Sequence, residues 1–318
     1  MDFRLTEDQR DLRAGIRDLL AGRYGREALR ESVSRAAGAD GRGGAAAGPG
    51  GGVVDRRLWR ELGEAGFFSL RLPESEGGVG LGLPEAVLVF EEAGRALLPG
   101  PLVATHLAAG VVPGAASGSA VVTAFDLDGP LVAHLGEADA VLGSSGLPAG
   151  EAVRSVDPLT PLWRCAGEVP SVSGFREEGT LLTAALQLGG ALRTVELAVR
   201  YAGEREQFGQ PIGGFQAVKH LCADMLVRAE VARTAVYAAA VTADAAEIAA
   251  AKLLADEAAV RGARDCLQVY GGMGFTWEAD VHLYLKRAWV RAEQWRTAAR
   301  AEELLAARLA EEAGAVTG

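Results

Sequence analysis

The sequence predicts a mainly α-helical protein with a small β section in its middle. Toward both ends of the 318-residue chain, long stretches carry apolar residues that recur every three or four positions, the spacing of an amphipathic helix. The segment from about Gly118 to Gly174 instead consists of short apolar runs separated by Gly, Pro, Asp and Ser, which is typical of strands and turns. Apolar residues make up 49% of the chain, enough to bury a sizeable core.

The N-terminal part predicts several helices, which we group as a helical domain over residues 1–115. Thr6 and Gln9 have the spacing of a capping box, and the apolar stripe that follows them marks a first helix. Residues 36–52 contain too much glycine for a packed element, so we expect a flexible surface loop there. The stretches RRLWRELGEAGFF and LPEAVLVFEEAGRALLPG predict further helices, the second of them ended by Pro99-Gly100.

The middle and C-terminal parts predict a small β domain over residues 116–174 and a four-helix bundle over residues 175–318. Three long helical patterns follow one another with short connections, which favours antiparallel packing. The fourth pattern, DVHLYLKRAWVRAEQWRTAARAEELLAARLAEEA, predicts one continuous last helix.

Charge and cysteine usage exclude several classes of function. The net charge of -10 argues against a nucleic-acid-binding protein, which normally presents a basic face. The three cysteines and four histidines are widely spaced, so we expect no metal site, no disulfide framework and a reducing, cytoplasmic location. No apolar run reaches 18 residues, so we expect no association with a membrane.

The segment REQFGQPIGGFQ, residues 205–216, joins two predicted helices. A simple helix end explains Gly209 and Pro211, because glycine often ends a helix and proline follows it. It leaves four residues unexplained: Arg205, Phe208, Phe215 and Gln216. An arginine fork suits a diphosphate, an aromatic ring can stack on a purine, and the start of the next helix can bind an anion. From the residues alone, a structural turn and a ligand-binding loop both stay open.

A second cluster, QVYGGMGFT at residues 268–276, also lies where two predicted helices meet. It can be read as a plain glycine turn. Alternatively, Gly271 and Gly272 let the backbone approach a phosphate while Gln268 bonds a ring or a ribose. The glycine spacing differs from the dinucleotide-binding fingerprint, and no strand precedes it.

Taken together, these segments resemble the acyl-CoA dehydrogenase family, flavoproteins that desaturate acyl-CoA thioesters between the α and β carbons. The similarity spans the chain and includes FRLTEDQ, LWRELGEAGFFSLRLPESEGGVGLGLPEAVLVFEEAGRALLPGPLVAT, YAGEREQFGQPIGGFQAVKH and QVYGGMGFTWEADVHLYLKRA. The resemblance implies an N-terminal helical domain, a middle β-barrel, here reduced, and a C-terminal four-helix bundle. This order matches the one predicted from the residues.

The resemblance also implies a cofactor, partners and binding residues. In such proteins the bundles pack into dimers, and the two motifs of one subunit reach FAD that is held mainly by its neighbour. The residues implied to bind FAD here are Arg205, Phe208, Phe215, Gln216, Gln268, Gly271 and Gly272. The other implied partners are an acyl-CoA substrate and an electron-transfer flavoprotein.

The catalytic base is the point at which the sequence departs from the family. Desaturation needs a base that removes the α proton while the β hydride leaves to the flavin, and a carboxylate with a raised pKa suits this step. The family places a glutamate at one of two positions, which fall here at Gly179 and Trp295. Two nearby glutamates become candidate bases after a small register shift, Glu178 and Glu293, although both also suit ordinary helix surfaces.

Two functional alternatives follow from this departure. Some bacterial acyl-CoA dehydrogenases are heteromers in which one chain carries the glutamate and a shorter related chain completes the FAD site, and this sequence resembles the shorter chains. The chain is then either one chain of such a heteromer, as a catalytic subunit or as a non-catalytic structural partner that completes the FAD site, or a homomeric enzyme that uses Glu178 or Glu293.

Overall fold

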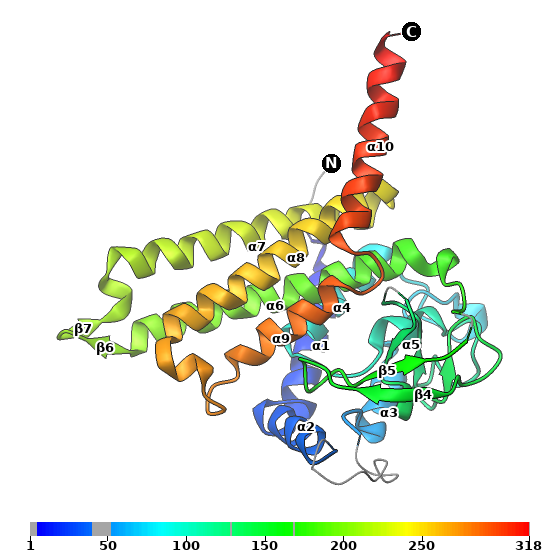
Figure 1. The fold of residues 1–318 in the computed structure, drawn as a ribbon, viewed down its shortest axis with the longest axis horizontal. Coiled ribbons are helices and arrows are strands. Elements are labelled where there is room, and N and C mark those ends of the chain that lie inside the picture. The colour runs from blue at the N-terminus through cyan, green and yellow to red at the C-terminus, as the bar shows by residue number, and fades with distance from the viewer. Residues whose placement is uncertain (1–4, 40–51, 128, 168, 318) are drawn as a thin grey trace.

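The computed structural model describes residues 5–39, 52–127, 129–167 and 169–317 (Figure 1). Five helices form the N-terminal part: α1 (Glu7–Arg23), α2 (Arg26–Ala39), α3 (Arg56–Glu64), α4 (Leu83–Arg95) and α5 (Leu102–Leu107). The predicted capping box is present, because the Gln9 amide nitrogen donates to Thr6 Oγ1 and the Thr6 amide donates to Gln9 Oε1. The predicted glycine-rich loop falls mostly on residues 40–51, outside the described residues.

The middle of the chain forms a small β section, as the short apolar runs predict. Its strands are β1 (Val122–Thr123), β2 (Leu131–Ala133), β3 (Ala140–Val141), β4 (Gly150–Val153) and β5 (Leu162–Cys165). Strand β5 lies between β2 and β4 and pairs antiparallel with both, whereas β1 pairs with β3 in parallel. A small apolar cluster that includes Phe125, Val132 and Val141 fills this section.

Three long helices dominate the C-terminal part: α6 (Arg176–Glu204), α7 (Gln216–Thr242) and α8 (Ala245–Tyr270). They contact one another and run side by side in Figure 1. Helix α8 begins at the N-cap Asp244, whose Oδ1 accepts from the Ala246 and Glu247 amides. A short hairpin of β6 (Glu206–Gln207) and β7 (Gln210–Pro211) connects α6 to α7 at the far end of these helices.

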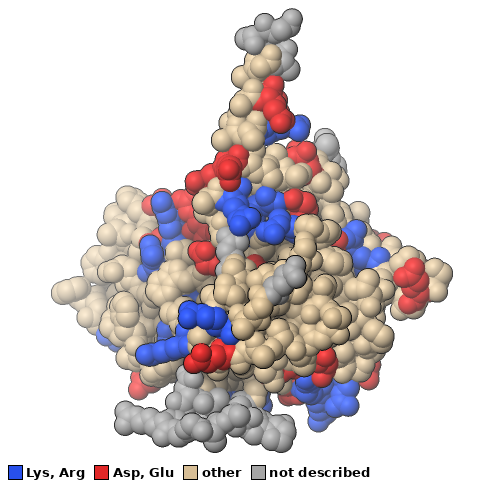
Figure 2. Space-filling view, turned by 45° about the vertical axis from the view of Figure 1, so that its right-hand side comes forward, with Lys and Arg blue, Asp and Glu red and all other residues tan. Residues whose placement is uncertain are grey.

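The prediction of one continuous last helix is wrong, because the helix is interrupted around Trp295. Helix α9 (Val281–Ala292) ends before this residue and α10 (Ala298–Thr317) begins after it. Trp295 adopts a left-handed backbone with φ of 61°, which is incompatible with a continuing helix. Helix α10 therefore leaves in a new direction and projects from the body of the molecule (Figures 1 and 2).

One large apolar core joins the N-terminal helices to the long C-terminal helices. It extends from Leu20 and Trp59 through Phe90 to Leu188 and Ala251, all of which are almost completely buried. Two glycines allow α4 and α6 to approach closely, because a Cβ on Gly189 would lie 1.8 Å from the Glu91 carbonyl oxygen and one on Gly94 would lie 2.0 Å from that of Leu186. This contact fixes the position of α6, which carries functional residues at both ends.

Candidate functional site

The first motif forms the exposed tip between α6 and α7. Phe208 and Gly209 are the two residues that connect β6 to β7, and both have positive φ, 54° and 80°. This is the geometry of a tight hairpin whose two central residues are left-handed. Phe208 is 93% exposed, and its ring lies edge-on to that of Phe215 with the centroids 6.1 Å apart.

Arg205 is held by hydrogen bonds of its backbone, whereas its side chain extends into solvent. Its amide donates to the Tyr201 carbonyl at 2.8 Å, and its carbonyl accepts from the Ile212 amide at 2.8 Å. Within the part of the chain that the structure describes, the exposed Arg205 guanidinium has no hydrogen bond or carboxylate partner. It is therefore held in place at its base and free to bind an anion.

The second motif lies at the end of α8 and continues into the 3-10 helix η5 (Gly271–Phe275). Gly271 has a φ of 58°, which ends α8, and neither Gly271 nor Gly272 has another atom within 4 Å of the place where a Cβ would stand. Gln268 is exposed on the last turn of α8. The backbone is thus open to close approach by a ligand at this point.

A pair of stacked tyrosines connects the two motifs. The rings of Tyr201 and Tyr270 lie 4.0 Å apart, at an angle of 13° between their planes. Tyr201 lies one turn before Arg205 in α6, and Tyr270 lies two residues after Gln268 at the end of α8. The stack therefore holds the ends of α6 and α8 together, and both motifs emerge at the same end of the long helices.

The residues present at this end fit FAD bound across an interface. A free guanidinium suits a diphosphate, an exposed aromatic ring suits an adenine, and open glycine backbone suits a phosphate. The exposure of Phe208 in particular is costly in water and is relieved if a ligand or a partner covers it.

The two positions that the family resemblance implies for the base, Gly179 and Trp295, come together in space and carry no carboxylate. Gly179, in the first turn of α6, lies directly against the Trp295 ring, because a Cβ on Gly179 would be 2.3 Å from Trp295 Cδ2. Trp295 is 2% exposed. The indole therefore fills the space at both positions.

Trp295 is fixed from two sides. Its amide donates to the Asp126 carbonyl at 2.5 Å, which connects it to the β section, and its carbonyl accepts from Arg176 Nη1 at 3.0 Å, which connects it to α6. The cavity beside Trp295 has a volume of only about 30 Å³ and is lined in part by Leu102, Thr183 and Arg291. Such a space has room for a water molecule, whereas ligand pockets usually measure about 300–1,000 Å³.

Glu178 is engaged in an ion pair that opposes the role of base. Its carboxylate bonds Arg71 and lies 3.6 Å from His106 Nε2. Burial raises the pKa of Glu178, but the neighbouring His106 and Arg71 outweigh this effect and lower it below its ordinary value. A base for α-proton removal needs the opposite shift.

The other two nearby glutamates also lie close to charged groups. Glu177 bonds Arg296. Glu293 is exposed at the end of α9, and its charge adds to the effect of burial in raising the pKa of Asp256. This places Glu293 toward the buried pair of Lys252 and Asp256, in which Lys252 also binds the Arg291 carbonyl at 3.1 Å.

The sequence alone did not predict the stack of Tyr201 on Tyr270 or the charged partners of Glu178. Tyr201 lies four residues before the first motif and Tyr270 lies within the second, but nothing in the sequence indicates that their rings stack. No signal marks Arg71 or His106 as partners of Glu178 either, because they lie about a hundred and about seventy residues away in the chain. Among the described residues, no helix is long and apolar enough to cross a membrane, and no group of acidic, His or Cys side chains could hold a metal ion.

Comparison with known proteins identifies relatives over most of the chain. The family model for the acyl-CoA dehydrogenase N-terminal domain matches residues 6–122, and the model for the acyl-CoA dehydrogenase C-terminal domain matches residues 173–313. The acyl-CoA dehydrogenase IpdE2 of Mycobacterium tuberculosis is 36% identical, with 89% of this chain and 91% of the relative covered. The benzylmalonyl-CoA dehydrogenase of Aromatoleum aromaticum is 30% identical, with 90% and 93% covered.

A solved structure shows the same fold. The ChsE4–ChsE5 complex of Mycobacterium tuberculosis contains a chain that superposes with a TM-score of 0.81 at 26% identity, and 98% of this chain and 99% of that chain are covered. The arrangement of N-terminal helices, small β section and long C-terminal helices is thus confirmed as that of these proteins.

Proposed function

Since the chain belongs to the acyl-CoA dehydrogenase family, whose cofactor is FAD, we propose that it is one subunit of a heteromeric acyl-CoA dehydrogenase. In this assembly it helps to hold FAD, and a related partner chain supplies the catalytic base. The observation that carries the proposal is the packing of Trp295 on Gly179, which fills both base positions with an indole.

The two exposed motifs give this chain its part in binding FAD. Arg205 binds the diphosphate with its free guanidinium, and Phe208, supported edge-on by Phe215, covers the adenine. Gln216 and Gln268 donate to the polar edges of the nucleotide, and Gly271 and Gly272 leave room for the backbone to approach it. When bound, FAD accepts the hydride from the β carbon of the acyl-CoA.

The base comes from the partner because this chain offers no suitable carboxylate. Glu178 is held by Arg71 with a lowered pKa, Glu293 is exposed beside another charged pair, and the cavity at Trp295 is too small for an acyl group. The partner therefore removes the α proton and encloses the acyl chain. An electron-transfer flavoprotein then takes the electrons, as in other members of the family.

Exposed apolar side chains support an assembly. On α7, Val227, Val231 and Val241 are 60%, 48% and 56% exposed and lie near one face of the helix. Phe275 in η5 is 76% exposed. Such patches usually mark protein interfaces, and the similar ChsE4–ChsE5 structure is itself a complex of two named chains.

Substitution of Arg205 tests the FAD role directly. In the purified complex, Arg205→Ala removes a charged hydrogen-bond donor from the diphosphate, so we expect FAD affinity to fall by at least about tenfold. Flavin content is measured from visible absorbance after dialysis, together with the subunit composition.

The matched control is Arg164→Ala, which removes an exposed arginine from β5 in the β section. It should retain the flavin content of the unmodified complex. Equal flavin retention in Arg205→Ala and Arg164→Ala would show that Arg205 does not bind the diphosphate.

A further inference from the structure

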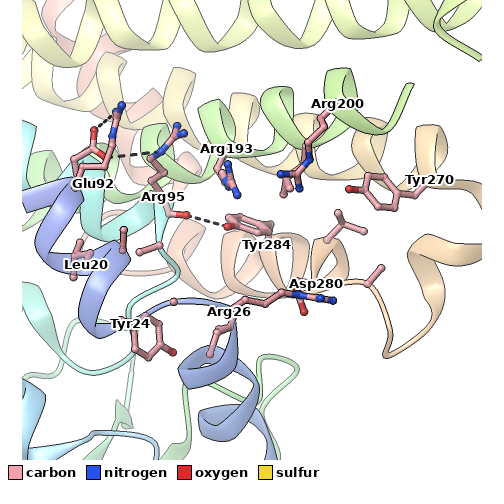
Figure 3. Close-up of a pocket in the computed structure, with 18 of the residues that line it drawn as sticks. Leu20, Tyr24, Arg26, Glu92, Arg95, Arg193, Arg200, Tyr270, Asp280 and Tyr284 are labelled. Atoms are coloured by element: carbon pink, nitrogen blue, oxygen red, sulfur yellow. Dashed lines mark hydrogen bonds and ion pairs between the residues drawn. The ribbon is translucent and has the colours of Figure 1, made fainter. Parts of the chain in front are cut away.

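A second cavity lies on the side of α6 opposite to α7, away from Trp295 and Gly179. It has a volume of about 650 Å³ and is enclosed by α1, α2, α4, α6, the end of α8 and the start of α9 (Figure 3). This is within the usual size range of small-molecule sites. None of the FAD-binding candidates of the two motifs lines it.

Two arginines of α6 line the upper wall of this cavity. Arg193, Leu197 and Arg200 occupy positions i, i+4 and i+7, so they share one face of the helix. In Figure 3, Arg193 and Arg200 both point toward the tyrosines that line the opposite side. Arg193 bonds Glu196 at 3.0 Å. Arg200, exposed at the rim, has no carboxylate partner among the described residues.

The remaining walls are mostly aromatic and apolar. The Tyr284 hydroxyl donates to the Arg95 carbonyl at 2.9 Å, so the polar end of this ring is already bonded, and the ring lines the cavity (Figure 3). Arg200 lies close enough to Tyr270 to affect its pKa, which burial chiefly raises and Arg200 partly lowers. The apolar part is contributed by side chains such as Leu20, Leu197 and Val281.

The charges around the cavity leave an excess of positive charge. Five arginines line it, Arg17, Arg26, Arg95, Arg193 and Arg200, against three acidic residues, Glu92, Glu278 and Asp280. Glu196, beside the cavity, bonds both Arg95 and Arg193. Arg30, also beside the cavity, bonds Asp280, so with both neighbours included six arginines stand against four acidic residues, in a protein whose net charge is -10. The positive charge is therefore local and directed at this cavity.

We propose that this cavity binds a small organic carboxylate with a flat, apolar body. The carboxylate bonds Arg200 at the rim, with Arg193 one step deeper, and the body lies between Leu197 and the face of Tyr284. Arginine matches a carboxylate with two parallel hydrogen bonds, and burial of the apolar body adds the rest of the affinity.

The test uses 2-naphthoate as the carboxylate probe and 2-naphthamide as its neutral counterpart. Both are titrated by calorimetry into the full-length chain in the assembly in which it purifies. We expect 2-naphthoate to bind and 2-naphthamide to bind at least about tenfold more weakly. Equal binding of the two probes, or no binding of 2-naphthoate at millimolar concentration, would overturn the proposal.

Two variants locate the site, and a third is the control. Arg200→Gln should weaken 2-naphthoate binding at least about tenfold, and Ala21→Trp should abolish it by filling the cavity from α1. Arg60→Gln, an exposed position on the remote α3, should bind like the unmodified chain. Unchanged binding in both Arg200→Gln and Ala21→Trp would place the probe elsewhere. Because Arg200 and Ala21 are both exposed, these changes leave the core intact, which circular dichroism verifies.

Discussion

At the scale of single residues, the contact between Gly179 and Trp295 is the reason for our proposal that a partner chain supplies the catalytic base. The family resemblance implies a glutamate at position 179 or 295, and here the Trp295 ring packs on Gly179 instead. The neighbouring Glu178 forms an ion pair with Arg71. The carboxyl groups of Glu178 and Asp126 lie near this contact, and each should make the free energy of unfolding depend on pH.

The ion pair of Glu178 predicts a loss of stability in acid. Because its pKa is lowered in the folded state, the pair stabilises the protein above the ordinary glutamate pKa of about 4.3, and this stabilisation disappears as the pH falls through the lowered value. Glu178→Gln should reduce the free energy of unfolding at pH 7 by about 1–3 kcal/mol. Denaturant unfolding at several pH values should show this difference shrinking below pH 4.3; a constant difference would contradict the assignment.

Asp126 predicts the opposite pH dependence. Its Oδ1 is buried without a hydrogen-bond partner among the described residues, and burial raises its pKa to about 7, against smaller lowering effects of its own backbone amide and of Gln294. The folded state therefore holds a proton that the unfolded chain releases, and stability falls as the pH rises from about 4 to about 7.

Asp126→Asn removes this ionisation and keeps an acceptor for Gln294, which donates to Asp126 Oδ2 at 2.8 Å. We expect the variant to be more stable than the unmodified chain above pH 7, by on the order of 2 kcal/mol, and to lose that advantage near pH 4. Thermal unfolding across this range measures the effect. A variant that is less stable at pH 8 would show that Asp126 is ionised and well solvated in the fold.

At the scale of helices and strands, the close crossing of α4 and α6 positions the functional residues. A Cβ on Gly189 would lie 1.8 Å from the Glu91 carbonyl oxygen and 2.7 Å from the Arg95 nitrogen, both of which are backbone atoms that cannot move aside. Gly190 is its neighbour in the same helix, but a Cβ there would meet only the Tyr284 ring at 3.9 Å. The two adjacent glycines therefore have different roles.

Gly189→Ala should destabilise the protein by about 1–3 kcal/mol or more through overpacking, although alanine favours helices. Gly190→Ala is the matched control and should be neutral or stabilise by up to about 1 kcal/mol. Chemical denaturation of both variants gives the comparison. Similar stabilities for the two would mean that the helices separate at little cost.

The elements also show how far the sequence alone could predict the structure. The long helices were predictable because their apolar spacing, the N-caps at Thr6 and Asp244 and the glycine turn at Gly271 all agree. The break at Trp295 was not, because RAEQWR favours a helix locally, and the hydrogen bonds that Trp295 makes with Asp126 and Arg176, both far away in the chain, form only in the folded protein.

The candidate site was predictable to a similar extent. The two motifs could be located from their residues, because a plain turn leaves Arg205 and Phe208 unexplained, whereas their role in binding FAD follows from the family resemblance and stays a prediction. Whether Glu178 is free or paired depends on Arg71 and His106, which approach it only in the folded chain.

At the scale of the whole molecule, the exposed groups lie where a second chain can reach them. The two motifs emerge at one end of the long helices, α7 presents exposed valines, and α10 projects from the body (Figure 1). Figure 2 shows acidic and basic side chains interspersed with uncharged ones over the face in view. These features agree with a subunit whose FAD contacts are completed in an assembly.

The measurement that tests this account most directly is native mass spectrometry of the tagged full-length chain, purified from its own cells. We predict a complex that contains a second, related chain, with FAD bound and with both chains required for flavin reduction by an acyl-CoA. A complex of identical chains that carries one FAD per subunit and is reduced by an acyl-CoA without any other chain would contradict the proposed heteromer.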